Sequence, residues 1–141
     1  MGTVVGVAHA YSRAEFMEAS RRLWQEHYGS ECGDTGNSFF SQIYDDALAE
    51  DLDRVSAEEL AHLGLSFWDY GDARSSDAIL VRVRSATRAD GSELPRDVLE
   101  IISRDRPFLV DSVMGEIGAQ GHDIVAMFHP IIQARRDDSG K

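Results

Sequence analysis

The passage from Val98 to Ile124 constrains the fold of this chain more strongly than any other stretch. A run rich in β-branched residues, 98–103, breaks at Asp105-Arg106-Pro107, and a second such run begins at Ile124. Between the two runs lie apolar residues at the three- and four-residue spacing of a helix, namely Leu109, Val110, Val113, Met114 and Ile117. Two glycines then predict the end of that helix. The order predicts a strand–loop–helix–strand unit.

The loop before this helix has the features of a small anion-binding site. Pro107 fits the first turn of a helix, where its missing N–H costs nothing, and Asp105 is the expected N-cap. The N–H groups of the helix N-terminus, beside Arg104 and Arg106, would suit an amino-acid carboxylate. Capping by Asp105 would satisfy the same donors and compete with that ligand. The sequence therefore leaves two roles open for Arg104, Asp105, Arg106, Pro107 and Phe108: an effector loop or a domain-contact loop.

Amphipathic stretches predict three helices in the first half of the chain, over residues 13–28, 38–50 and 56–71. Ser12 and Glu15 have the spacing of a capping box, and Ser56 and Glu59 repeat that spacing before the third helix. The polar, glycine-rich residues 29–37 predict a linker between the first two helices.

Strand signals predict a small sheet in the second half of the chain. Residues 78–84 alternate with period two, which favours a strand with Ile79, Val81 and Val83 facing inward. A short turn separates this strand from a second one over 97–103. We expect the two strands to be antiparallel neighbours, because a short link favours that arrangement.

A last strand is predicted over residues 124–135, with Pro130 at an edge or a bulge because proline cannot donate to a ladder. Asp137–Gly140 then has the composition of a hairpin turn. The expected organisation is a disordered or extended N-terminus over 1–11, a helical segment over 12–76, and a partial α/β sandwich over 77–141.

The balance of charges argues against several classes of partner. Twenty-five acids and 14 bases give the 141 residues a formal net charge of −11. Such a charge repels phosphate backbones and anionic lipid headgroups, so we expect neither nucleic acid nor a membrane as a partner. Arg82, Arg84 and Arg88 form a local basic cluster, for which the solvated face of a strand is the favoured interpretation. The single cysteine, Cys32, and the lack of a secretory leader predict a cytoplasmic chain.

No residues group into a catalytic or metal-binding motif in the sequence. The five histidines, at positions 9, 27, 62, 122 and 129, lack the spacing of a helical metal site. Cys32 has no obvious base near it, and neither a G-x-S-x-G nor a G-x-G-x-x-G motif occurs. We therefore expect no catalytic, cofactor-binding or metal-binding residues here, and no cofactor bound by this chain.

Particular phrases of the sequence resemble a known family. Asp105–Val113 reads Asp-Arg-Pro-Phe-Leu-Val-Asp-Ser-Val, and His129-Pro130-Ile131 and Arg135-Arg136-Asp137 follow it. This pattern resembles the N-terminal ACT-like region of the large bacterial NAD-dependent (NAD-specific) glutamate dehydrogenases. The preceding helices fit as well, with Phe39-Phe40 and Phe67-Trp68, so the resemblance covers residues 12–141.

The resemblance implies an α+β fold in which a helical segment precedes a partial ACT or ferredoxin-like sheet, a β-hairpin and one βαβ unit, that ends before the fold is complete. It also implies a non-catalytic regulatory or assembly fragment, inactive by itself, whose main partner is the rest of the parent polypeptide. The parent would bind NAD and convert L-glutamate to 2-oxoglutarate, ammonium and NADH with residues outside this region.

One position departs from the ligand-binding members of the ACT class. These domains commonly have glycine directly after the proline of the loop, where this chain has Phe108. We expect the Phe108 side chain to pack into the core or to plug the pocket, which favours a scaffold or domain-contact role. The alternative to a dehydrogenase fragment is a free-standing ACT-type amino-acid sensor acting as a dimer.

The exposed edge of the incomplete sheet is expected to be covered by the strand over 79–84 or by a strand from a second copy. A homo-oligomer that forms through this edge therefore stays open.

Overall fold

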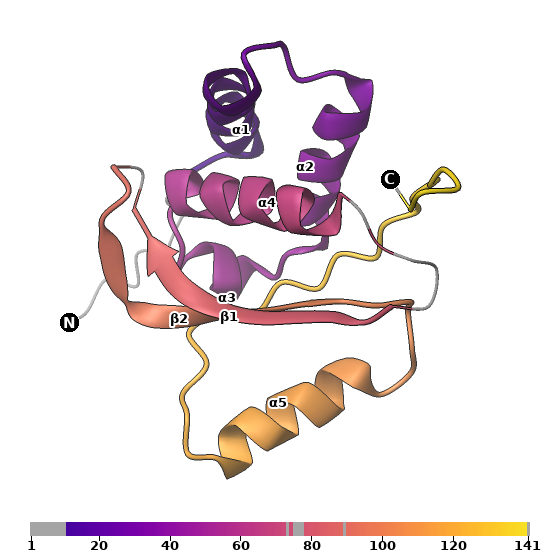
Figure 1. Cartoon of the computed structure of the whole chain (residues 1–141). Coiled ribbons are helices and arrows are strands. Elements are labelled where there is room, and N and C mark those ends of the chain that lie inside the picture. The colour runs from indigo at the N-terminus through magenta and orange to yellow at the C-terminus, as the bar shows by residue number, and fades with distance from the viewer. Residues whose placement is uncertain (1–10, 73, 75–77, 89, 141) are drawn as a thin grey trace, which may run out of the picture.

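The computed structural model describes residues 11–72, 74, 78–88 and 90–140, and it has an α+β fold as the sequence predicts. Four helices lie on one side of a two-stranded sheet, and a fifth helix lies on the other side (Figure 1). In chain order the elements are α1 (Arg13–Tyr28), α2 (Asp34–Asp46), α3 (Ala49–Leu52), α4 (Ala57–Gly71), β1 (Leu80–Thr87), β2 (Glu93–Ile102) and α5 (Leu109–Ala119).

Side-chain caps fix the starts of two helices where the sequence predicts them. The Ser12 hydroxyl accepts a hydrogen bond from the Glu15 N–H at 3.2 Å, and the Glu15 carboxylate accepts one from the Ser12 N–H at 3.1 Å. The predicted capping box of α1 is therefore confirmed. At α4 the Ser56 hydroxyl accepts from the Glu59 N–H at 3.2 Å, so Ser56 is the N-cap.

The bounds predicted for the second helix are wrong, because α2 begins at Asp34 rather than at residue 38 and ends at Asp46 rather than at residue 50. Its first turn includes residues assigned to the linker. Tertiary hydrogen bonds hold that turn: Arg21 on α1 donates to the Asn37 side chain at 2.9 Å, and Asn37 donates to the Cys32 carbonyl at 3.1 Å. These contacts outweigh the low helix propensity of the local residues.

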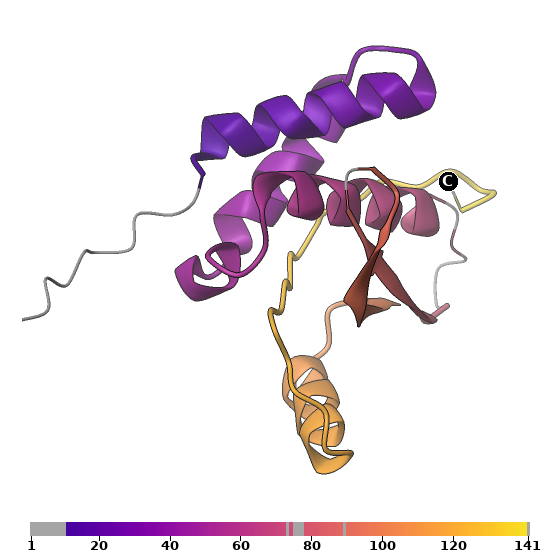
Figure 2. The same cartoon turned by 90° about the vertical axis from the view of Figure 1, so that its left-hand side faces the viewer.

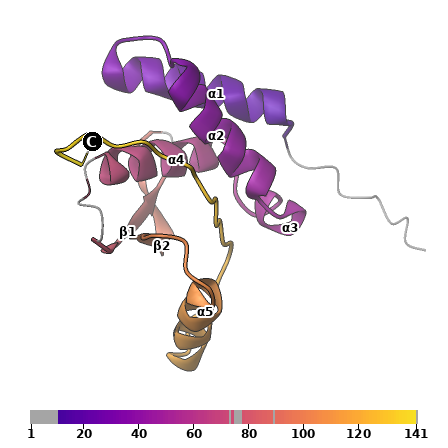
Figure 3. The ribbon, with the colours of Figure 1, turned by 90° about the vertical axis from the view of Figure 1, so that its right-hand side faces the viewer.

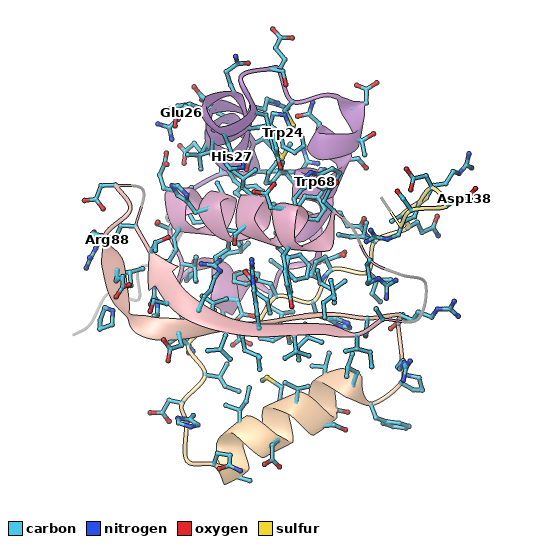
Figure 4. All side chains as sticks on the ribbon, in the orientation of Figure 1. Trp24, Glu26, His27, Trp68, Arg88 and Asp138 are labelled. Carbon is cyan, nitrogen blue, oxygen red and sulfur yellow. The ribbon has the colours of Figure 1, made fainter. Side chains whose placement is uncertain are left out.

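The core lies among the helices on one side of the sheet. Phe16, Phe40 and Leu60, from α1, α2 and α4, are the largest hydrophobic side chains that are fully buried. Trp24 and Trp68 lie at the edge of this core with their ring centroids 5.4 Å apart, and they face one another between α1 and α4 (Figure 4). Figure 3 shows α1 and α2 on the side of α4 away from the sheet. The helical segment contains four helices rather than the predicted three. The additional helix is the short α3.

The sheet consists of β1 and β2, which pair antiparallel as the short connection predicts. Val83 pairs with Leu99, and an irregularity between Ser85 and Thr87 precedes the turn. The predicted inward orientation of Ile79, Val81 and Val83 is wrong, because these side chains are 52%, 56% and 66% exposed. Charged side chains occupy the side of the sheet that faces α4, so the aliphatic side chains point the other way.

The last predicted strand does not form. Residues 124–135 run without helix or strand from α5 to the helical layer (Figure 2). Side chains of the helical segment bind the backbone of residues 124–135. Gln42 on α2 donates to the Ile131 carbonyl, Asp51 on α3 accepts from the Met127 N–H at 3.3 Å, and Arg54, just after α3, donates to the Val125 carbonyl at 3.0 Å. These bonds replace those of a ladder, so the βαβ unit lacks its second strand.

The expected turn at the end of the chain is present. Asp137 accepts a hydrogen bond from the Ser139 N–H at 2.9 Å, and Gly140 adopts a φ of 90°. At the other end, the predicted disordered or extended segment lies outside the described residues except for Tyr11. Tyr11 itself is buried in the helical core. Within the part of the chain that the structure describes, no helix is both long and apolar enough to cross a membrane.

Candidate functional site

The loop over Arg104–Phe108 joins the end of β2 to the start of α5 (Figure 1). Its five consecutive residues are all exposed, so the whole loop lies at the surface. Asp105 does not cap α5 and Pro107 does not lie in its first turn, so both predictions are wrong. The N-cap is Phe108, which makes no side-chain capping bond, and its carbonyl accepts from the Ser112 N–H at 2.9 Å.

Phe108 combines a strained backbone with an exposed aromatic ring. Its φ of 66° lies in the left-handed region, which costs an L-residue about 1–2 kcal/mol. Its side chain is 77% exposed, so the expectation that it packs into the core or plugs a pocket is wrong. The backbone reverses at this residue so that α5 can begin at Leu109, and the ring consequently points to solvent. An exposed ring at a strained position is typical of a contact surface rather than of a packing residue.

The side of the sheet that faces α4 carries a buried ion network. Glu100 on β2 is 5% exposed, and Arg82 and Arg84 on β1 both donate to its carboxylate, Arg84 at 3.0 Å from Nε. Arg84 Nη2 lies 2.9 Å from the same carboxylate, off the direction of a hydrogen bond, so its contribution is electrostatic. The favoured interpretation of Arg82 and Arg84 as a solvated strand face is therefore wrong.

This network ties the sheet to α4. Arg82 donates to the Ser66 hydroxyl at 2.9 Å and to the Ser66 carbonyl at 3.1 Å. Its guanidinium lies 4.0 Å from the centroid of the Tyr70 ring. The sequence analysis did not identify Glu100 as the partner of these arginines. The alternation of residues between the two faces of paired strands was the signal that could have found it. In the antiparallel register Arg82 pairs with Glu100, so an acid and two bases share one face.

Neither of two shallow hollows on the described surface brings catalytic groups together. A hollow of about 260 Å³ is lined by Arg21, Gln25, Glu31 and Cys32. Burial raises the pKa of the Cys32 thiol, which keeps it protonated and poorly nucleophilic. A second hollow, of about 210 Å³, lies between α3, Met114 of α5 and residues 124–127.

Tertiary structure pairs His27 with a carboxylate, which the sequence did not indicate. Its Nε2 lies 2.8 Å from the Asp69 carboxylate, and Tyr28 donates to that carboxylate too. These contacts join the end of α1 to α4 at the surface. Among the described residues, His, Cys, Asp and Glu side chains nowhere form a group of three that could hold a metal ion.

The fold and the exposed loop define a small α+β domain consistent with a partial ACT-like fold, in which a hairpin is followed by one helix. Residues 39–141 match the family model of the glutamate dehydrogenase ACT1 domain, and the chain belongs to this family. The chain thus matches the N-terminal ACT-like region of the NAD-specific glutamate dehydrogenases.

Two curated relatives carry that name. The chain is 25% identical over 133 residues to the NAD-specific glutamate dehydrogenase of Pseudomonas aeruginosa, and 24% identical over 133 residues to that of Halomonas elongata. Each alignment covers 94% of this chain but 8% of the relative. No solved structure matches the chain.

Proposed function

We propose that this chain is a non-catalytic N-terminal region of a large NAD-dependent glutamate dehydrogenase, with a regulatory or assembly role. The observation that carries the proposal is the asymmetry of the alignments, which take in nearly all of this chain and 8% of each relative. In the proposed parent, the conversion of L-glutamate and NAD to 2-oxoglutarate, ammonium and NADH takes place elsewhere in the polypeptide. A cytoplasmic location is part of the proposal, supported by the two bacterial metabolic enzymes that the chain resembles.

We propose that NAD binds the remainder of the parent polypeptide rather than this region. The Rossmann type of dinucleotide site has a glycine-rich turn between a strand and a helix, so that the backbone approaches the pyrophosphate. The junction from β2 to α5 has Phe108 at its left-handed position and no glycine in residues 103–108. This junction therefore does not resemble a site of that type.

Within this function, the Arg104–Phe108 loop is proposed as a domain-contact loop rather than an effector loop. Phe108 offers an exposed aromatic anchor, and Arg104 and Arg106 precede it with positive charge on a chain that is acidic as a whole. Aromatic and arginine side chains dominate the energetics of protein contacts. The chemistry of the loop thus suits an acidic, apolar surface of the same enzyme.

Expressing the uninterrupted reading frame and assaying its product tests the proposal. We expect a polypeptide of over a thousand residues that reduces NAD when glutamate is added. Removing residues 12–141 from it should leave the glutamate-binding and hydride-transfer groups in place and change its assembly or its response to effectors. A native product of this length alone, or a full product without glutamate-dependent NAD reduction, would refute the proposal.

Calorimetry of the 141-residue chain against the twenty amino acids tests the alternative of a free-standing sensor. We expect no heat of binding at micromolar amino acid. Micromolar binding by a chain that is dimeric at the same concentration would favour the sensor.

A further inference from the structure

The Arg104–Phe108 loop ends in an aromatic ring that its own chain leaves in solvent. The Phe108 side chain is 77% exposed, at a residue whose φ is 66°. Arg106 is exposed as well, and it forms no ion pair within the part of the chain that the structure describes. Aromatic and arginine side chains are the usual anchors of protein contacts, so the loop has the composition of a group that inserts into a partner.

The hollow of about 210 Å³ beside α3 has the complementary character. Its lining is largely apolar, and Leu48 and Val125 within it are 54% and 39% exposed. Met114 and Met127 also line it, and thioether groups make favourable contacts with aromatic rings. Glu50 is exposed at the same hollow and forms no ion pair among the described residues. The hollow thus offers apolar contact for a ring and a carboxylate for a base.

The size of this hollow suits one aromatic side chain. A cavity of about 150 Å³ holds a benzene molecule. The hollow, at about 210 Å³, therefore has room for the phenyl ring of a phenylalanine. Drug-sized ligands fill clefts of about 300–1,000 Å³, which is more than this hollow provides. Its volume thus favours a protein side chain over a free ligand of that size.

Phe108 does not fill the hollow of its own chain. It is the N-cap of α5, and its ring is not among the groups that line the hollow. Met114 lies six residues further along the same helix, so the helix holds the two residues about 9 Å apart along its axis. The ring could approach its own hollow only if the first turns of α5 unwound. An intact Phe108 loop therefore meets such a hollow on another copy of this region.

We propose that Phe108 of one copy inserts into the hollow beside α3 of a neighbouring copy, with Arg106 against Glu50. This inference rests on the proposed function, in which the region has an assembly role and the loop is a contact loop. Charge favours this occupant, because residues 11–72, which supply the α3 side of the hollow, carry 14 acids and four bases, whereas residues 104–108 carry one acid and two bases. The loop and the hollow are separate patches, so every copy offers both.

Photo-cross-linking of the full product of the reading frame tests the contact directly. p-Benzoylphenylalanine replaces Phe108 and keeps an aromatic ring there, and the enzyme is assembled from a mixture of light and nitrogen-15-labelled chains. Benzophenone reacts preferentially at methionine, so light chains should be cross-linked from position 108 to Met114 or Met127 of heavy chains. The same group at Glu18, on the exposed side of α1, is the control and should not reach these methionines. Cross-links within one label, or to another part of the polypeptide, would overturn the proposal.

A charge exchange tests the pairing of Arg106 with Glu50. Arg106→Glu and Glu50→Arg should each lower the yield of the mixed cross-link roughly two- to fivefold, as expected for an exposed ion pair, and the two together should restore it. Both residues are exposed, so the thermal midpoint of the 141-residue chain should stay within a few degrees and report that each variant folds. Glu18→Arg is the matched control and should leave the yield unchanged. A double variant no better than the single variants would overturn the pairing.

The outcomes separate this inference from the proposed function. A full product that reduces NAD with glutamate but gives no mixed cross-link at the hollow would refute the contact between copies and leave the proposed function intact. A full product without glutamate-dependent NAD reduction would refute the proposed function, whatever its cross-links.

Discussion

Arg84 on β1 donates from Nε to Glu100 on β2 at 3.0 Å, across the side of the sheet that faces the helical layer. Glu100 is 5% exposed, and its carboxylate neutralises Arg82 as well. One buried acid thus compensates two bases and fixes which side of the hairpin faces α4. Removing that acid should leave two half-buried positive charges without a carboxylate partner.

Glu100→Gln should therefore lower the free energy of unfolding by about 2 kcal/mol. A fully buried pair would lose about 3–5 kcal/mol, but the two arginines keep partial contact with water. Chemical denaturation at pH 7 measures the change. Glu116→Gln, on the exposed side of α5, is the matched control and should stay within about 0.5 kcal/mol. A Glu100→Gln chain as stable as the control would show that the network does not hold the sheet.

Tyr11→Phe should raise the stability at pH 7 by about 1 kcal/mol, because the Tyr11 hydroxyl is buried and has no hydrogen-bond partner among the described residues. Denaturation of the two chains side by side measures this difference. A loss of stability would mean that the hydroxyl is satisfied in solution.

The same substitution predicts a change in alkaline behaviour. Burial, with smaller contributions from Tyr44 and nearby carboxylates, raises the pKa of Tyr11 from 10.0 to about 12. The folded chain therefore disfavours the phenolate, so this stabilisation is complete below pH 10 and is lost as the pH rises towards 12. The unsubstituted chain should lose about 2 kcal/mol more than Tyr11→Phe over that range. Parallel curves of stability against pH for the two chains would refute the assignment.

Phe108 offers a test of backbone strain. Phe108→Gly should be more stable than Phe108→Ala by about 1 kcal/mol, because only glycine adopts a φ of 66° without a penalty. Comparing the two substitutions removes the effect of losing the ring, which is exposed in the 141-residue chain. Thermal and urea unfolding both report the difference. Equal stabilities would mean that the loop relaxes out of the left-handed region.

Two glycines in helices should respond in opposite directions. A Cβ at Gly64 would lie 2.9 Å from the Phe40 ring and 3.2 Å from Ile43, so Gly64→Ala should lower stability by about 1 kcal/mol despite the higher helix propensity of alanine. A Cβ at Gly115 would meet nothing within 4 Å, so Gly115→Ala should raise stability by about 0.5 kcal/mol. Differential scanning calorimetry of both variants measures the sign. A gain from both would contradict the close approach of α4 to α2.

Local sequence signals predicted the elements whose ends are set by neighbouring residues. The capping box of Ser12 and Glu15 gave the start of α1, and the periodicity of its apolar residues gave its length. The short link between β1 and β2 gave their antiparallel pairing. The motif Asp105–Val113 correctly indicated the family. The structural roles predicted for Asp105 and Pro107 within it were wrong.

Local signals along the chain predict an α+β fold with a capped helix, a hairpin and a helix after the hairpin, because caps, turns and periodicity act over a few residues. Contacts between residues far apart in the sequence set which face of the hairpin is inside and where α2 begins. Such contacts also hold residues 124–135 against the helical layer, so that these residues do not form a strand. Alternation alone favours burying Val81 and Val83. The partners of Arg82 on α4 favour the opposite orientation. A buried charge without hydrogen bonds costs more free energy than an exposed aliphatic side chain, so the arginines lie inside and the valines outside.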